Sequence, residues 1–124
     1  MFPNVETPVP DQETLSRFLL SSSHYSKENN RVKFAAFMPA TDGATSVFRV
    51  DSLSESERWA IGQTVSQQSA RTLYGRADFT AQDVRQAELE VWVSEPPPRH
   101  ANIQGWPSEK SQQKMKAIEL SESA

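Results

Sequence analysis

The sequence predicts an α+β domain, with a small three-stranded, mainly antiparallel sheet and about three helices packed on one face. Apolar residues alternate with other residues at 31–37, 45–50 and 88–93, which is the period of a strand. Helix-capping residues precede several of the remaining segments. The 124 residues amount to one domain, and no internal repeat or linker divides 1–124.

The N-terminal segment combines prolines with a short apolar pattern. Residues 1–10 contain three prolines, and we expect them to form an extended arm. A helix over 12–20 follows, because Leu15, Phe18 and Leu19 recur at the i, i+3, i+4 spacing of one helix face.

The next segment carries the pattern of a β-hairpin. Residues 31–37 alternate in polarity, and 45–50 are rich in β-branched and aromatic side chains. Pro39 and Gly43 lie between them and supply turn chemistry, since proline fixes φ and glycine accepts a positive φ. The two strands are therefore expected to pair with each other.

The middle of the chain carries two helix starts. Ser54 and Glu57 have the spacing of a capping box, which predicts a helix over 54–64 that Gly62 weakens. Thr80 is a second N-cap and opens a short helix ending near Ala87. Residues 88–93 form the third strand, whose direction stays open because a crossover precedes it.

The C-terminal segment predicts one more helix. Ser108 is the expected cap of a helix over 108–120, with Met115, Ala117 and Ile118 facing the core. Residues 121–124 are expected to fray.

Composition excludes several classes of protein. The chain has no cysteine, which excludes disulfides, thiolate metal sites and cysteine nucleophiles. The absence of disulfides, together with an N-terminus that lacks the pattern of a signal peptide, favours the cytoplasm. Apolar runs are too short to span a bilayer, so we expect no membrane association. The net charge of −3 gives no general attraction to nucleic acid.

The common catalytic and cofactor motifs are also missing. Four scattered glycines make no phosphate-binding loop, and no G-x-S-x-G elbow occurs. The two histidines, His24 and His100, lie far apart and lack metal-site spacing, so we expect no metal and no cofactor.

The segment 96–107 is the leading candidate for function. Its three consecutive prolines fix φ and remove backbone donors, which predicts a stiff loop. The loop would display the side chains of Arg99, His100, Asn102 and Trp106. Arginine and tryptophan dominate interface hot spots, so the first hypothesis is a non-catalytic binding or accessory module for a protein partner or a small anionic ligand. In the structural alternative, His100 hydrogen-bonds a backbone carbonyl and Trp106 anchors the core.

A second hypothesis is a metal-independent enzyme acting on a phosphodiester or nucleotide. His24 and His100 would serve as acid and base, because imidazoles titrate near neutral pH. Lys33, Arg49 or Arg99 would hold the phosphate. In the structural alternative, His24 is a solvated or capping residue and Arg49 pairs with a neighbouring acid.

A third hypothesis is nucleic-acid binding without chemistry. Arg31, Lys33, Arg49 and Arg99 would contact phosphates, and binding would weaken steeply with salt. The acidic net charge counts against this hypothesis.

Four short motifs give the chain a family resemblance. They are R-V-K at 31–33, A-F-M-P at 36–39, S-V-F-R at 46–49 and P-R-H-A-N-I-x-G-W-P at 98–107. Together they resemble a group of small uncharacterised bacterial proteins, over roughly residues 15–120. The resemblance implies a bacterial, cytoplasmic protein and no particular activity.

Overall fold

The computed structural model describes residues 9–26, 31–95 and 97–124, and it has the α+β class that the sequence predicts. Its helices are α1 (Glu55–Ser69), α2 (Ala81–Gln86) and α3 (Lys110–Ser123), with 3₁₀ turns η1 (Ser22–His24) and η2 (Phe34–Phe37). Its strands are β1 (Thr14–Leu19), β2 (Tyr25–Ser26), β3 (Arg31–Val32), β4 (Thr45–Arg49), β5 (Gly75–Thr80), β6 (Glu90–Val93) and β7 (His100–Gln104).

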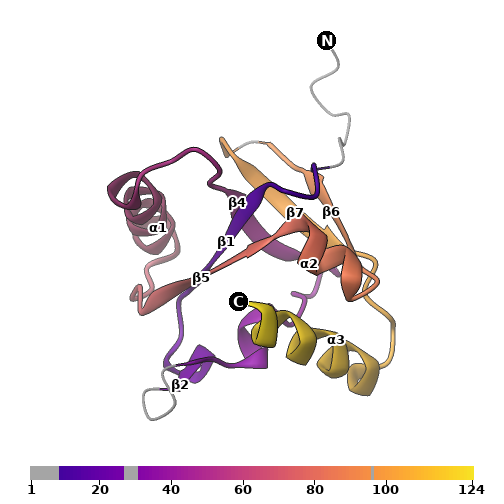
Figure 1. Cartoon of the computed structure of the whole chain (residues 1–124). Helices are drawn as coiled ribbons and strands as arrows, with labels where there is room; N and C mark the ends of the chain where they lie inside the picture. The colour runs from indigo at the N-terminus through magenta and orange to yellow at the C-terminus, as the bar shows by residue number, and fades with distance from the viewer. Residues whose placement is uncertain (1–8, 27–30, 96) are drawn as a thin grey trace.

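The main sheet is larger than the predicted three strands. Within the described residues it has five antiparallel strands in the order β5-β1-β4-β7-β6, and β2 and β3 form a separate two-stranded ribbon (Figure 1). The predictions for 45–50, 54–64 and 88–93 are confirmed as β4, α1 and β6, and α1 continues to Ser69. The Thr80 cap is confirmed as part of a capping box that opens α2.

The helix predicted over 12–20 is wrong, because β1 occupies that segment. Leu15 and Leu19 face one side of the sheet and Phe18 faces the other, and all three are buried. Such a strand, flanked by β5 and β4, is apolar on both faces, and its spacing then imitates that of a helix.

The predicted hairpin between 31–37 and 45–50 is also wrong. β3 covers Arg31–Val32 alone and pairs with β2, whereas β4 pairs with β1 and β7. After β3 the chain turns into η2, where the consecutive residues Ala36 and Phe37 are both buried. Phe37 meets the ring of Phe79 edge-on across the core, at a centroid distance of 5.4 Å.

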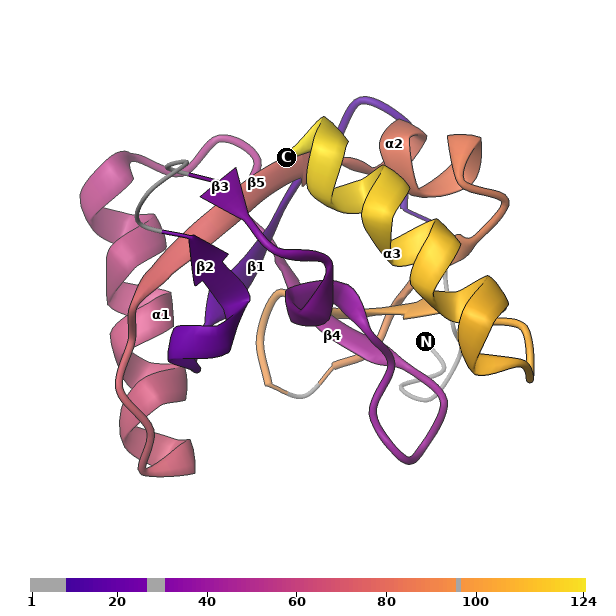
Figure 2. The same cartoon turned by 90° about the horizontal axis from the view of Figure 1, so that it is seen from below.

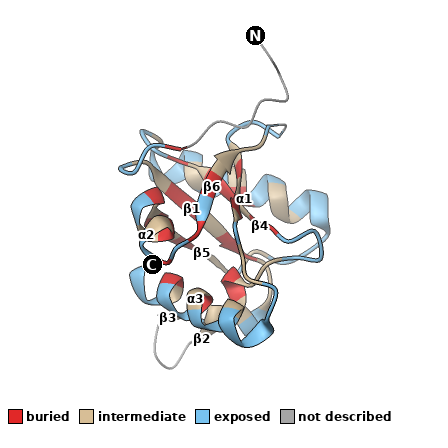
Figure 3. Cartoon of the chain, turned by 90° about the vertical axis from the view of Figure 1, so that its right-hand side faces the viewer, coloured by how far each residue is buried: buried red, intermediate tan, exposed pale blue. Residues whose placement is uncertain are grey.

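Helices cover both faces of the sheet, not one face as predicted. α1 packs on the face that carries Phe18, Phe48 and Val50. α2, α3 and η2 pack on the opposite face, where Leu15 and Val47 belong to the larger core (Figures 1 and 2). Buried residues follow the strands between these two layers (Figure 3).

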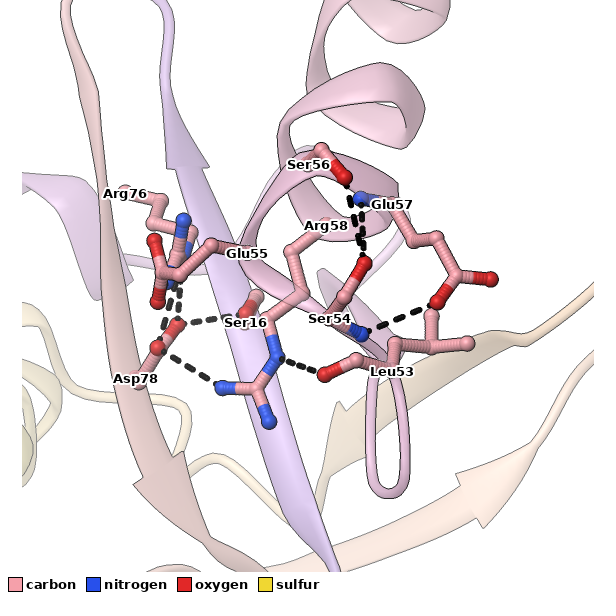
Figure 4. Close-up of polar contacts among 9 residues, drawn as sticks. All are labelled: Ser16, Leu53, Ser54, Glu55, Ser56, Glu57, Arg58, Arg76 and Asp78. Carbon is pink, nitrogen blue, oxygen red and sulfur yellow. Dashed lines mark hydrogen bonds and ion pairs between the residues drawn. The ribbon is translucent and has the colours of Figure 1, made fainter.

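A polar network holds the start of α1 against β1 and β5. Asp78 accepts hydrogen bonds from Ser16 Oγ at 2.5 Å, from Arg76 Nε at 3.0 Å and from Arg58 Nη1 at 3.2 Å (Figure 4). The predicted capping box of Ser54 and Glu57 is present beside this network (Figure 4). Buried Ser16 is thereby satisfied, as the interior of a sheet requires.

The segment 96–107 is not a single loop. Residues His100–Gln104 within it form β7, an interior strand between β4 and β6, in which Ala101 and Ile103 are fully buried. Pro97 and Pro98 belong to a tight turn before the strand, in which the amide of His100 donates to the carbonyl of Pro97 at 3.1 Å. Arg99 in this turn has a φ of 69°, the left-handed region.

The last helix begins later than predicted and turns a different face inward. Glu109 occupies the N-cap position without a side-chain cap, so Ser108 is not the cap. Ala117 is buried as predicted, but Met115 is 66% exposed and Ile118 is 37% exposed. Met115 lies two positions before Ala117, about 200° around the helix, so both cannot face the core.

The structure differs from the prediction at the C-terminal end and describes only part of the segment predicted at the N-terminal end. The predicted arm over 1–10 falls largely on residues 1–8, which lie outside the described residues. Val9 is buried, and its amide donates to the carbonyl of Val91 at 3.3 Å. At the other end, α3 continues to Ser123, beyond the expected end at Leu120. Among the described helices, none has the length and the apolar run that crossing a bilayer requires.

Candidate functional site

A cleft of about 400 Å³ opens where β4 and β7 meet the turns η1 and η2. We call it the two-histidine cleft, because His24 of η1 and His100 of β7 both line it. Four further polar residues of its wall matter for chemistry: Arg17, Ser46, Arg71 and Asn102.

Strand register explains how β4 and β7 contribute to the cleft. Ser46 is paired with Asn102, and Phe48 is paired with His100. Since side chains alternate along a strand, these four residues project from the same face of the sheet. The ring of Phe48 meets that of His100 edge-on at 5.3 Å, which helps to fix the orientation of the imidazole.

Both ring nitrogens of His100 have partners. Nδ1 lies 2.8 Å from the carbonyl oxygen of Ser94, and Nε2 lies 2.6 Å from Oγ of Ser46. A carbonyl oxygen only accepts hydrogen bonds, so Nδ1 carries the proton. Nε2 of the neutral ring is therefore an acceptor, and the Ser46 hydroxyl donates to it.

Arg17 closes the gap where β1 diverges from β4. The two strands pair only through Leu15 and Ser16 of β1. Beyond that point, Arg17 donates from Nε to the carbonyl of Ala36 at 2.7 Å and from Nη1 to the carbonyl of Ser46 at 2.9 Å. Burial, followed by the charge of Arg71, lowers the pKa of Arg17 to about 10, so the guanidinium stays charged at neutral pH.

Arg71 enters the cleft from the end of α1. Ala70 takes a left-handed conformation with a φ of 56°, and the amide of Arg71 donates to the carbonyl of Ser66 at 3.0 Å. This helix ending fixes where Arg71 leaves the helix. Among the described residues, the Arg71 guanidinium has no acidic partner within ion-pair distance.

His24 lies in cationic surroundings. Burial first, and then the charges of Arg17 and Arg71, lower the pKa of His24 below its ordinary value. Its Nδ1 is buried and has no hydrogen-bond partner in the described part of the chain. A buried polar atom without a partner is uncommon and costly, so this atom is a candidate contact for a ligand.

Two more polar groups of the wall are engaged locally. Asp42 contributes a carboxylate, whose Oδ1 accepts the amide of Ala44 at 3.1 Å. Asn102 donates from Nδ2 to Oγ of Ser94 at 3.3 Å. The two guanidiniums of the wall exceed its one carboxylate, so the cleft is suited to an anion.

The structure brings His24, His100 and Asn102 together and separates them from the other predicted site residues. Lys33 is exposed, and its amide donates to the carbonyl of His24 at 2.8 Å. Arg49 is paired with Glu13, as the structural alternative predicts, in a separate depression that Arg99 also lines.

Trp106 is half-buried against the larger core, as its structural alternative predicts, and its Nε1 donates to the carbonyl of Ile103 at 3.3 Å.

Three residues to which we assign chemistry in the cleft were not predicted as site residues from the sequence: Arg17, Ser46 and Arg71. Arg17 stood inside a segment predicted as a helix, where an arginine is ordinarily solvated. Ser46 was one residue of a strand, and only the register with β7 places it beside His100. The sequence offered no signal for Arg71 beyond its position after the helix predicted over 54–64.

Comparisons of the chain with family models, with curated proteins and with solved structures found no match. The function of the cleft must therefore be inferred from its own geometry. Two other hollows are less suited to an anion, because one arginine of each is paired with a carboxylate of the same hollow: Arg76 with Asp78, and Arg49 with Glu13.

Proposed function

We propose that the two-histidine cleft binds a phosphodiester or nucleotide and cleaves it without a metal, with His100 as base and His24 as acid. The observation that carries this proposal is the shared wall of one cavity, on which both histidines lie with Arg17 and Arg71. A bacterial, cytoplasmic location belongs to the same proposal and rests on the cysteine-free composition and the resemblance in sequence.

In this proposal Arg17 and Arg71 bind the phosphate. The guanidinium of Arg17 is held by two backbone carbonyls, so little side-chain freedom is lost when an anion binds. Its third nitrogen, Nη2, has no hydrogen bond to any described residue, and the guanidinium of Arg71 lacks an acidic partner there. Guanidinium forks match the oxygens of a phosphate, and fixed positive charge stabilises the charge that develops there in the transition state.

In this proposal the imidazoles of His100 and His24 transfer the protons. In its neutral form His100 keeps its proton on Nδ1, which donates to the carbonyl of Ser94, so Nε2 is the basic nitrogen on the cleft side. His24 is favoured in its neutral form while the cleft is empty, because burial and the two arginines lower its pKa. A bound phosphate opposes the charges of those arginines and raises the proton affinity of His24. The substrate thus supplies the conditions under which His24 acts as the acid.

The test is the hydrolysis of bis(4-nitrophenyl) phosphate in the presence of a chelator. We expect chelator-resistant release of nitrophenol with a bell-shaped dependence of kcat/KM on pH, and a loss of about 100-fold or more in His24→Ala and His100→Gln. Arg71→Ala is expected to lower kcat/KM, through a higher KM, a lower kcat or both. Arg99→Ala removes the same charge outside the cleft and is expected to leave both unchanged.

Two results would overturn the proposal. One is full activity in His24→Ala, as long as the variant has the circular dichroism spectrum of the parent chain. The other is an equal effect of Arg71→Ala and Arg99→Ala, which would indicate a general effect of net charge. A different result would favour the binding module at 96–107. In that case Arg99→Ala and Trp106→Ala would abolish the binding of a protein partner and leave the activity of the cleft unchanged.

A further inference from the structure

We infer that Ser46 is the nucleophile of the two-histidine cleft, activated by His100, whose orientation is held by the main-chain carbonyl of Ser94. This inference rests on the proposed function, because it names the hydroxyl group that His100 deprotonates. Three atoms define the relay: Oγ of Ser46, Nε2 of His100 at 2.6 Å, and the Ser94 oxygen at 2.8 Å from Nδ1.

The arrangement meets the geometric requirements for an activated serine. The nucleophile and its base lie within hydrogen-bond distance, and a third group orients the base through its other nitrogen. The carbonyl of Ser94 takes the position that a carboxylate holds in the familiar triads, and it fixes the same tautomer. The edge-on contact with Phe48 limits rotation of the ring further.

The relay is built on rigid backbone. Ser46 lies in β4 opposite Asn102 of β7, and its carbonyl accepts the hydrogen bond from Nη1 of Arg17 at 2.9 Å. The amide of Ser94 donates to the carbonyl of His100 at 2.9 Å, so the orienting residue is tied to the strand that carries the base. Sites held by strands position reacting groups better than sites held by loops.

Surroundings distinguish this relay from an ordinary cross-strand hydrogen bond. Ser46 and His100 are half-buried and line the open cleft, so a ligand can reach them. The positive charges of Arg17 and Arg71 lie in the same wall, where they favour an anionic substrate and its transition state. Asp42, the carboxylate on the wall, already accepts the amide of Ala44.

The reaction then proceeds in two balanced steps. Oγ of Ser46 attacks phosphorus and passes its proton to Nε2 of His100, while the bond to the leaving oxygen breaks and His24 protonates that oxygen. This step leaves a phosphodiester or phosphomonoester on Ser46, an imidazolium at His100 and a neutral His24.

In the second step His24 takes a proton from water, which attacks the same phosphorus. The bond to Oγ breaks, and His100 returns its proton to Ser46. Both histidines are thereby restored.

The direct test is labelling of the full chain with diisopropyl fluorophosphate, followed by peptide mass mapping. Attack by Ser46 forms the phosphorus–oxygen bond, expels fluoride and transfers the serine proton to His100. We expect one adduct, on Ser46, that inorganic phosphate suppresses by occupying the cleft. His100→Gln is expected to slow labelling by about 100-fold or more, because the base is lost.

A matched control is Ser108→Ala, since Ser108 is exposed and outside the cleft wall. It should label and cleave like the parent chain, whereas Ser46→Ala should do neither. An adduct on any other serine, or labelling that is indifferent to phosphate, would overturn the inference. The mapping uses the parent chain, so it stands even where a variant fails to fold.

The outcomes separate this inference from the proposed function. If Ser46→Ala cleaves bis(4-nitrophenyl) phosphate at the parent rate, Ser46 is not the nucleophile and the proposed function survives. If the parent chain forms the Ser46 adduct but cleaves no phosphodiester, the nucleophile stands and the proposed reaction is wrong.

Discussion

Substitution of Gly62 by alanine sets helix propensity against packing. Gly62 lies inside α1 and is buried against the sheet. A Cβ added there would lie 2.7 Å from Cδ1 and Cε1 of Phe18 and 3.1 Å from Cδ2 of Leu73. The ring of Phe18 is only 3% exposed and packs on Phe48 at a centroid distance of 5.8 Å, so it has little room to withdraw. Gly62 therefore permits the close approach of α1 to β1.

The two contributions to stability have opposite signs. Alanine in place of glycine inside a helix stabilises by about 1 kcal/mol. Overpacking of a buried contact destabilises by about 1–3 kcal/mol. The contact lies well inside van der Waals distance and involves two ring carbons, so we expect overpacking to dominate. The predicted net loss is roughly 1 kcal/mol, or a decrease in Tm of about 4 °C.

Thermal and urea unfolding of a double-mutant cycle measure this effect. Gly62→Ala is expected to lower the free energy of unfolding, whereas it should cost less, or stabilise, in a Phe18→Leu background. Gln63→Ala, at an exposed neighbour, is the control and should stay within about 0.5 kcal/mol of the parent. A stabilisation near 1 kcal/mol by Gly62→Ala alone would refute the packing of α1 on Phe18.

Two further predictions concern the network at Asp78 and the inward face of α3. Burial of Asp78 opposes ionisation, but hydrogen bonds from Arg76 and Ser16 hold its pKa below the ordinary 3.8. The ionised Asp78 therefore stabilises the fold above pH 3.8, and this stabilisation is lost as the pH falls through the lower pKa of the folded state. In Asp78→Asn, the free energy of unfolding measured with urea should depend less on pH in this acid range. Leu120→Ala should cost about 2–5 kcal/mol in the same unfolding assay, and Met115→Ala less than about 0.5 kcal/mol, because Leu120 is fully buried and Met115 is exposed. Equal effects of these last two substitutions would contradict the inward face of α3.

Local signals in the sequence predicted local structure. Ser54 with Glu57 satisfies donors at a helix start through residues three positions apart, and Thr80 does the same for α2. Both starts could therefore be located without knowledge of the fold. The α+β class also followed from the sequence, because helical caps and strand alternation occur in the same short chain.

Features that depend on distant partners could not be predicted in this way. The spacing of Leu15, Phe18 and Leu19 is compatible with one helix face or with a strand buried on both sides, and only β4 and β5 decide between them. The strand β7 was not predicted, because the consecutive prolines before it indicated a loop over 96–107. Its residue Ile103 is nevertheless apolar and fully buried, as in a core strand.

In the candidate site, too, some residues could be recognised from the sequence, whereas others depend on the fold. His24 and His100 attract attention by residue type alone, since imidazoles titrate near neutral pH. Ser46 and Arg17 are unremarkable in sequence, and their roles arise from the register of β4 with β7 and from the divergence of β1. Arg49 has the right chemistry in the sequence, but the structure commits it to Glu13.

The most direct test of anion binding in the two-histidine cleft is an NMR titration of the His24 imidazole with and without adenosine monophosphate. His100→Gln assigns the two signals, and sodium chloride at equal ionic strength is the control. Because burial first, and then the charges of Arg17 and Arg71, disfavour the protonated ring, the free protein should titrate His24 below the ordinary pKa of 6.5, and the nucleotide should raise that pKa. A His24 that titrates at 6.5 and does not respond to the nucleotide would contradict the existence of an anion site in this cleft.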